Sequence, residues 1–114
     1  MYQSITTTDL AHIIESGANI TLIDVREIDE WEQINIPQAV LIPLSTIEHR
    51  LEEIDFSRPV YVLCRSGGRS ANVCTWLESH SKQATNVTGG IKQFYQEGSN
   101  LLEITEHLKS EYLG

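Results

Sequence analysis

Short apolar runs alternate with helical patterns along this chain, and the alternation constrains the fold more than any other feature. The runs Ile20–Val25 and Val60–Leu63 are rich in β-branched residues and mostly apolar. Continuous apolar runs of this kind suit strands buried on both faces of a parallel sheet. A weaker strand is predicted at Ala84–Val87 and a short extended piece at Ala39–Ile42. Because strands that alternate with helices build βα units, the sequence predicts an α/β fold with a parallel central sheet.

The predicted helices lie between these runs. Residues 6–17 form one, since Thr6 and Asp9 resemble a capping box and Gly17 can end the helix. A second opens at Ser45, which has an acidic capping-box partner three positions on. Apolar spacing predicts a third helix at Ser70–Ser79 and a short one that ends at residue 98. The acidic stretch 27–32 is predicted to be a loop.

The last sixteen residues show a helical pattern of their own. Apolar side chains recur at Leu101, Ile104, Leu108 and Tyr112, with charged residues between them. We therefore expect residues 99–114 to form a C-terminal amphipathic helix that extends beyond a core of about residues 5–98.

Length and charge bound the classes of protein to which the chain can belong. Its 114 residues match one domain, no Pro-, Gly- or Ser-rich stretch divides them, and 40% apolar residues suffice for one core. We expect a single domain over residues 1–114. The formal net charge of −8 repels phosphate backbones and anionic lipids, so neither nucleic acid nor a membrane is an expected partner.

The first residues carry no basic leader pattern, and no apolar run is long enough to span a bilayer. We therefore expect a cytoplasmic protein, in which Cys64 and Cys74 stay reduced. The four histidines lack the spacing of metal ligands, and neither a metal nor a cofactor is expected.

The segment most informative about chemistry follows the second strand. Cys64 stands at the carboxyl end of that strand, where ligands bind in open α/β sheets. Gly67 and Gly68 allow the loop to curl until its amides converge on the cysteine sulfur. Arg65 and Arg69 add positive charge, and together these groups favour a reactive thiolate, a persulfide anion or a bound oxyanion. A merely structural turn in an acidic protein would not need such a concentration of cations.

The same loop resembles the active-site loop of the rhodanese family. The resemblance runs in the right order over about residues 5–98, and it rests on the following segments: Asp24–Glu27 with Glu30, Ile36–Pro37 with Ala39, Cys64–Ser70, and Gly89–Ile91.

That resemblance implies a parallel sheet of about five strands flanked by helices on both faces, and transfer of sulfane sulfur to a thiophilic acceptor. A small donor such as thiosulfate, and a protein or thiol acceptor, are the implied partners. Cys64 would be the nucleophile and sulfur carrier. The other implied site residues are the loop residues Arg65, Ser66, Gly67, Gly68, Arg69 and Ser70, in which four amides (66–69) cradle the sulfur and the two arginines contact anions, and the supporting charges Asp24 and Arg26.

The sequence alone does not exclude two other functions. A cysteine-dependent phosphatase shares the fold by resemblance, but such enzymes place five residues between cysteine and arginine, whereas four separate Cys64 from Arg69. A non-catalytic module that recruits a partner would commonly lose the cysteine. Cys74 lies on the apolar side of its predicted helix, and a buried core residue is the preferred interpretation over a second reactive thiol.

Overall fold

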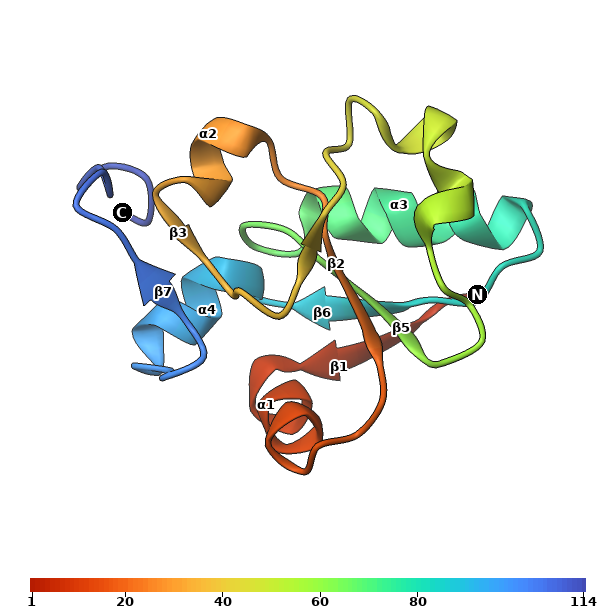
Figure 1. The fold of residues 1–114 in the computed structure, drawn as a ribbon, viewed down its shortest axis with the longest axis horizontal. Coiled ribbons are helices and arrows are strands. Elements are labelled where there is room, and N and C mark those ends of the chain that lie inside the picture. Colours follow the sequence, from red (N-terminus) through yellow and green to blue (C-terminus); the bar gives the residue numbers. More distant parts are fainter.

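The computed structural model describes residues 1–114 and contains one five-stranded parallel sheet with helices on both faces (Figure 1). A separate two-stranded sheet is formed by β3 and β7. The elements in chain order are β1 (Gln3–Thr6), α1 (Thr7–Glu15), β2 (Thr21–Asp24), α2 (Ile28–Trp31), β3 (Ile34–Asn35), β4 (Val40–Leu41), the 3₁₀ turns η1 (Ile47–His49) and η2 (Leu51–Glu53), β5 (Val60–Leu63), α3 (Gly68–Ser79), β6 (Thr85–Thr88), α4 (Gly90–Gln96) and β7 (Glu103–Ile104).

The strand order in the large sheet is β1-β6-β5-β2-β4, and every neighbouring pair is parallel. The two strands predicted from apolar runs, β2 and β5, therefore lie side by side near the centre, as strands buried on both faces should. Strand β1 was not predicted, because Ile5 is its only apolar residue. It occupies an edge of the sheet, where a strand needs less apolar surface.

Alternate side chains of the central strands point to opposite faces of the sheet, where they pack into two separate hydrophobic cores. On one face, Ile23 and Val62 pack with Cys74 and Leu77 of α3. On the other face, Leu63 packs with residues of α1 and α4, including Phe94. Figure 1 shows α3 and α1 on opposite sides of the sheet. None of the helices has the length and apolar character that crossing a lipid bilayer requires.

Two of the predictions between β2 and β5 were wrong. The acidic stretch forms the short helix α2, because Glu27 and Glu30 make a reciprocal capping box, with glutamate in place of the usual hydroxyl residue. The helix predicted from Ser45 is instead the pair of 3₁₀ turns η1 and η2, and no side chain caps either of them. The Ser45 hydroxyl does not cap a helix, because it donates to Glu27 Oε1 at 2.8 Å.

The predicted C-terminal helix was also wrong. Residues 103–104 form β7, antiparallel to β3, and the rest of the tail consists of turns. Backbone groups that a helix would pair internally are taken by a distant segment, since the Thr105 amide donates to Gln33 O at 3.0 Å and the Lys109 amide to Gln33 Oε1 at 3.0 Å. Leu108 and Tyr112 still pack against the α1–α4 core, but from turns, so their helical spacing in the sequence was misleading.

Candidate active site

The loop between β5 and α3 is held in shape from both ends. Cys64 follows β5 directly, and Gly67 has a left-handed backbone (φ +110°) that starts α3 at Gly68. The carbonyls of Cys64 and Arg65 accept hydrogen bonds of 3.0 and 2.9 Å from the amides of Ile91 and Lys92 in α4. The start of α4 therefore fixes the cysteine end of the loop.

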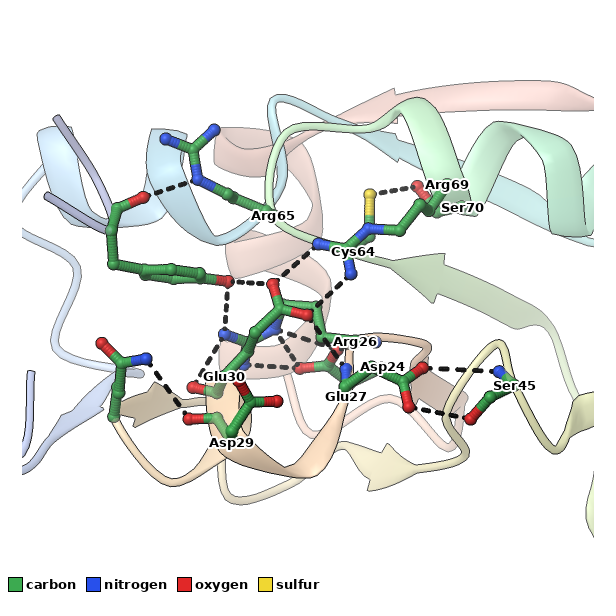
Figure 2. Close-up of polar contacts among 12 residues, drawn as sticks. Asp24, Arg26, Glu27, Asp29, Glu30, Ser45, Cys64, Arg65, Arg69 and Ser70 are labelled. Atoms are coloured by element: carbon green, nitrogen blue, oxygen red, sulfur yellow. Dashed lines mark hydrogen bonds and ion pairs between the residues drawn. The ribbon is translucent and has the colours of Figure 1, made fainter. Parts of the chain in front are cut away.

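The sulfur of Cys64 is enclosed by hydrogen-bond donors. Cys64 is only 1% exposed, and the Gly67 amide lies 3.1 Å from its Sγ. The Ser70 hydroxyl lies 3.3 Å from the same sulfur, a contact drawn in Figure 2. Burial acts to raise the pKa of this thiol, but hydrogen bonds from the Ser70 side chain and from the amides of Ser70, Gly67 and Ser66 outweigh burial, so the pKa is lowered. The site favours a thiolate, which is the nucleophilic form of cysteine.

Ser70 links the sulfur to a second buried polar residue, Asn86 of β6. Its hydroxyl lies 2.6 Å from Asn86 Oδ1, and Asn86 Nδ2 donates to Gly67 O at 3.3 Å. A hydroxyl carries a single proton, so Ser70 can donate either to Asn86 or to the sulfur. The hydroxyl of Ser70 can thus change its partner with the protonation state of Cys64. It donates to Asn86 when Cys64 is a thiol and to Sγ when Cys64 is a thiolate.

We expect Ser70→Ala to raise the pKa of Cys64, because it removes a donor that stabilises the thiolate. At neutral pH less thiolate would be present, and alkylation by iodoacetamide would slow several-fold. The pH profile of that alkylation measures the effect, with its midpoint expected at higher pH than in the wild type. Ser66→Ala is the matched control, because the Ser66 side chain is exposed and only its backbone faces the sulfur. A profile that is the same in all three proteins would contradict this role for Ser70.

Arg69 is engaged by an acidic residue of α2. Its two terminal nitrogens lie 2.7 and 2.8 Å from the two carboxylate oxygens of Glu30 (Figure 2). Burial acts to raise the pKa of Glu30, but hydrogen bonds from Arg69, the Glu27–Glu30 backbone contact and Tyr112 lower it to about 2. Glu30 is therefore a carboxylate at any ordinary pH, and it ties α2 to the loop that carries Cys64.

The expected supporting charges, Asp24 and Arg26, form a fully buried pair beneath α2. Arg26 Nη2 lies 2.8 Å from Asp24 Oδ2, and Arg26 Nε lies 3.1 Å from both carboxylate oxygens. Arg26 Nη2 also donates to Ile34 O, and Nη1 donates to the Tyr112 hydroxyl and to Glu30 O. Breaking such a pair on one side leaves an unpaired buried charge, which costs about 3–5 kcal/mol. Neither residue has a hydrogen bond to the loop, so they support the site through other residues.

Arg65, the second expected anion contact, points to the C-terminal segment. Its Nε donates to the Tyr112 carbonyl at 2.6 Å, and its guanidinium carbon lies 5.5 Å from the centre of the Tyr112 ring. Figure 2 shows Arg65 extending away from the Cys64 sulfur. Each arginine of the loop thus has a partner within the protein, and contact with an anionic donor stays a prediction for both.

Sequence reasoning missed three residues of this cluster. In the sequence, Glu30 stands out only as part of a motif, Asn86 only as part of a strand, and Tyr112 only as one position of a helical pattern. The motif singles out Glu30 but not its partner Arg69, and no local signal marks Asn86 or Tyr112, because their partners lie far away in the chain. Cys74, in contrast, is the buried core residue that was predicted, and burial raises the pKa of its thiol to about 12.

Comparison with known proteins agrees with this geometry. The family described as the rhodanese-like domain matches residues 6–97. The chain is 39% identical over 89 residues to YtwF of Bacillus subtilis, whose name assigns it provisionally to the sulfurtransferases, with 78% of this chain and 86% of that one covered. It is 31% identical over 99 residues to a sulfurtransferase of Allochromatium vinosum, with 86% and 92% covered.

Among solved structures, a rhodanese-like domain protein from Staphylococcus aureus superposes with a TM-score of 0.78 at 35% identity, covering 91% of this chain and 99% of that one. The relatives support sulfur transfer as the general activity, and the structural match supports the parallel sheet with its flanking helices. The chain belongs to the family of rhodanese-like domains.

Proposed function

We propose that this protein carries sulfane sulfur as a persulfide on Cys64, taking it from thiosulfate or a persulfide donor and passing it to a thiophilic acceptor. One observation above all supports the proposal. The Cys64 sulfur stands at the carboxyl end of a central strand, with the Gly67 amide and the Ser70 hydroxyl directed at it and with a lowered pKa. Hydrogen-bond donors around the sulfur and a lowered pKa favour the thiolate, which is the form in which a cysteine acts as a nucleophile.

The first half of the reaction loads the enzyme. The Cys64 thiolate attacks the outer sulfur of thiosulfate, a new sulfur–sulfur bond forms, and the donor's own sulfur–sulfur bond breaks with its electron pair leaving as sulfite. With an alkyl persulfide the corresponding alkyl thiolate leaves. Cys64 then carries one additional sulfur, whose negative charge is stabilised by hydrogen bonds from the loop and by the start of α3.

The second half unloads the enzyme. A nucleophilic acceptor such as cyanide attacks the outer sulfur of the Cys64 persulfide, and the bond between the two sulfur atoms breaks. Its electron pair returns to Cys64 as the thiolate, and the product is thiocyanate. No oxidant or reductant is consumed, and the free thiolate is ready for another cycle.

The position of Arg69 argues against phosphatase chemistry. Both of its terminal nitrogens are occupied by Glu30, whereas a phosphate ester bound over the sulfur would need the guanidinium for itself. The four-residue interval between Cys64 and Arg69 also gives a ring suited to a single sulfur atom. A recruitment module has no need of a buried cysteine whose pKa is lowered by its loop.

Two assays on the unmodified protein distinguish these functions. We expect thiocyanate to form catalytically from thiosulfate and cyanide, and no hydrolysis of aryl phosphates above the rate in a buffer blank. Efficient phosphate hydrolysis without thiocyanate would support the phosphatase instead. A folded protein that hydrolyses no aryl phosphate and forms thiocyanate from neither thiosulfate nor an alkyl persulfide would support the recruitment module.

A further inference from the structure

Tyr112, which lies outside the residues matched by the family, contacts Arg26, Glu30 and Arg65. Its hydroxyl accepts a hydrogen bond from Arg26 Nη1 at 3.0 Å and donates to Glu30 Oε2 at 2.8 Å. Glu30 in turn accepts both bonds from Arg69. A chain of hydrogen bonds therefore connects buried Arg26, through Tyr112 and Glu30, to Arg69.

The protonation states along this chain are well defined. Burial raises the pKa of Tyr112 to about 12, with Arg26 lowering it and Glu30 raising it further. Tyr112 therefore keeps its proton at ordinary pH. It shares this proton in a hydrogen bond with the Glu30 carboxylate, which stays ionised because the pKa of Glu30 is about 2. Together with the Glu27 amide, which lies 3.1 Å from Glu30 Oε1, the hydroxyl holds Glu30 in the position from which it pairs with Arg69.

The same residue holds the other arginine of the loop. Arg65 donates to the Tyr112 carbonyl and stacks over its ring. Tyr112 is half-buried and packs on the α1–α4 core with Leu108 and Leu113, so it is anchored independently of the loop. Tyr112 thus binds Arg65 directly and supports the pairing of Arg69 with Glu30 indirectly.

We propose that Tyr112 is a specificity-determining residue that disfavours dianionic sulfur donors by keeping Arg65 and Arg69 engaged, so that the enzyme prefers persulfide donors without a sulfonate group. This inference rests on the proposed sulfur transfer and refines its donor. A dianion such as thiosulfate needs cationic partners close to the sulfur. To obtain them it must displace Glu30 or Tyr112, and it also meets the negative charge of Glu30. An alkyl persulfide needs no such partner.

The test compares two donors with cyanide as the common acceptor: thiosulfate, and the persulfide of 2-mercaptoethanol, which has no charged group apart from the sulfur. We expect the wild type to show the higher kcat/KM with the persulfide. In Tyr112→Ala the ratio of kcat/KM for thiosulfate to that for the persulfide should rise about tenfold, which corresponds to about 1.4 kcal/mol, mainly through a lower KM for thiosulfate. Tyr112→Ala removes the ring beneath Arg65 and the hydroxyl that bonds to Glu30, but it keeps the backbone carbonyl at position 112. Thiosulfate turnover should also become more sensitive to salt, because the less firmly held arginines attract the dianion.

Two further variants keep the test decisive. Tyr112→Phe keeps the ring and the carbonyl for Arg65 and removes only the hydroxyl bond to Glu30, which keeps its bonds to Arg69 and to the Glu27 amide. The ratio of kcat/KM for thiosulfate to that for the persulfide should therefore rise in the same direction by a smaller factor, even if Tyr112→Ala does not fold. Tyr95→Ala is the matched control, because Tyr95 is an exposed tyrosine on α4, and its ratio should equal that of the wild type.

A ratio unchanged in both Tyr112 variants, or a parallel loss with both donors, would overturn the inference and leave sulfur transfer intact, since it would show only structural support by the tail. A wild type that gains sulfur from neither donor would overturn the proposed function, and the inference with it.

Discussion

Cys64→Ser is expected to reduce thiocyanate formation from thiosulfate and cyanide by about a thousandfold or more, to the rate of the uncatalysed reaction. Serine fits the same position, but its oxygen cannot form the persulfide on which both half-reactions depend. Removal of a covalent nucleophile typically causes a loss of this size. Steady-state thiocyanate production, on protein shown to be folded by circular dichroism, measures the loss.

The other thiol supplies the control. Cys74 is buried between α3 and the sheet, has no polar partner and has a raised pKa, so it has the properties of a packing residue. Cys74→Ala should lower the free energy of unfolding because it leaves a small cavity. Turnover per folded molecule should stay close to that of the wild type. Residual turnover in Cys64→Ser that disappears in the double variant would place the chemistry on Cys74 and contradict the assignment.

Gly90→Ala is expected to destabilise the protein by more than about 3 kcal/mol and to disrupt the active-site loop. Gly90 has a left-handed backbone (φ +57°), which disfavours any side chain. A Cβ at this position would also overlap the carbonyl of Cys64 and would lie only 2.6 Å from the carbonyl oxygen of Arg65. Backbone atoms cannot move aside as a flexible side chain can, so the start of α4 and the loop would separate.

Gly98→Ala separates the cost of the left-handed backbone from the cost of the overlap with the loop. Gly98 has a similar backbone (φ +65°), but nothing lies within 4 Å of the position that an alanine methyl group would occupy there. Its substitution should therefore cost only about 1–2 kcal/mol, the cost of the left-handed conformation alone. Urea unfolding gives the free energy of unfolding of each variant, and thiocyanate turnover shows whether the active-site loop is intact. Equal destabilisation by the two substitutions would mean that α4 does not press on the loop as the structure indicates.

The parts of the fold that could be predicted are those encoded in consecutive residues. The apolar runs at β2 and β5, the capping threonine of α1 and the glycines at the start of α3 all act locally, and each prediction is confirmed to within a few residues. The tail could not be predicted. Its apolar spacing suits a helix, but Gln33 offers its main-chain and side-chain oxygens to the tail amides, and the β-strand pairing of Ile104 with Ile34 depends on a partner far away in the chain.

The candidate site also has a part that the sequence predicts and a part that it does not. The loop around Cys64 was visible because its charges and glycines stand side by side in the sequence. The partners of its arginines were not, because Glu30 is 39 positions from Arg69 and the Tyr112 carbonyl is 47 positions from Arg65. The sequence indicates two cations beside the sulfur, and only the structure reveals that both already have partners within the protein.

The central claim is that the Cys64 sulfur carries the transferred sulfur atom, and peptide mass mapping tests it most directly. The wild-type protein is treated with excess persulfide donor or thiosulfate, trapped with an alkylating reagent, digested and measured. We predict one added sulfur atom on the peptide that contains Cys64, none on the peptide that contains Cys74, and loss of the added sulfur when cyanide treatment precedes the alkylation. Added sulfur on the Cys74 peptide, or none on the Cys64 peptide with either donor, would contradict the account.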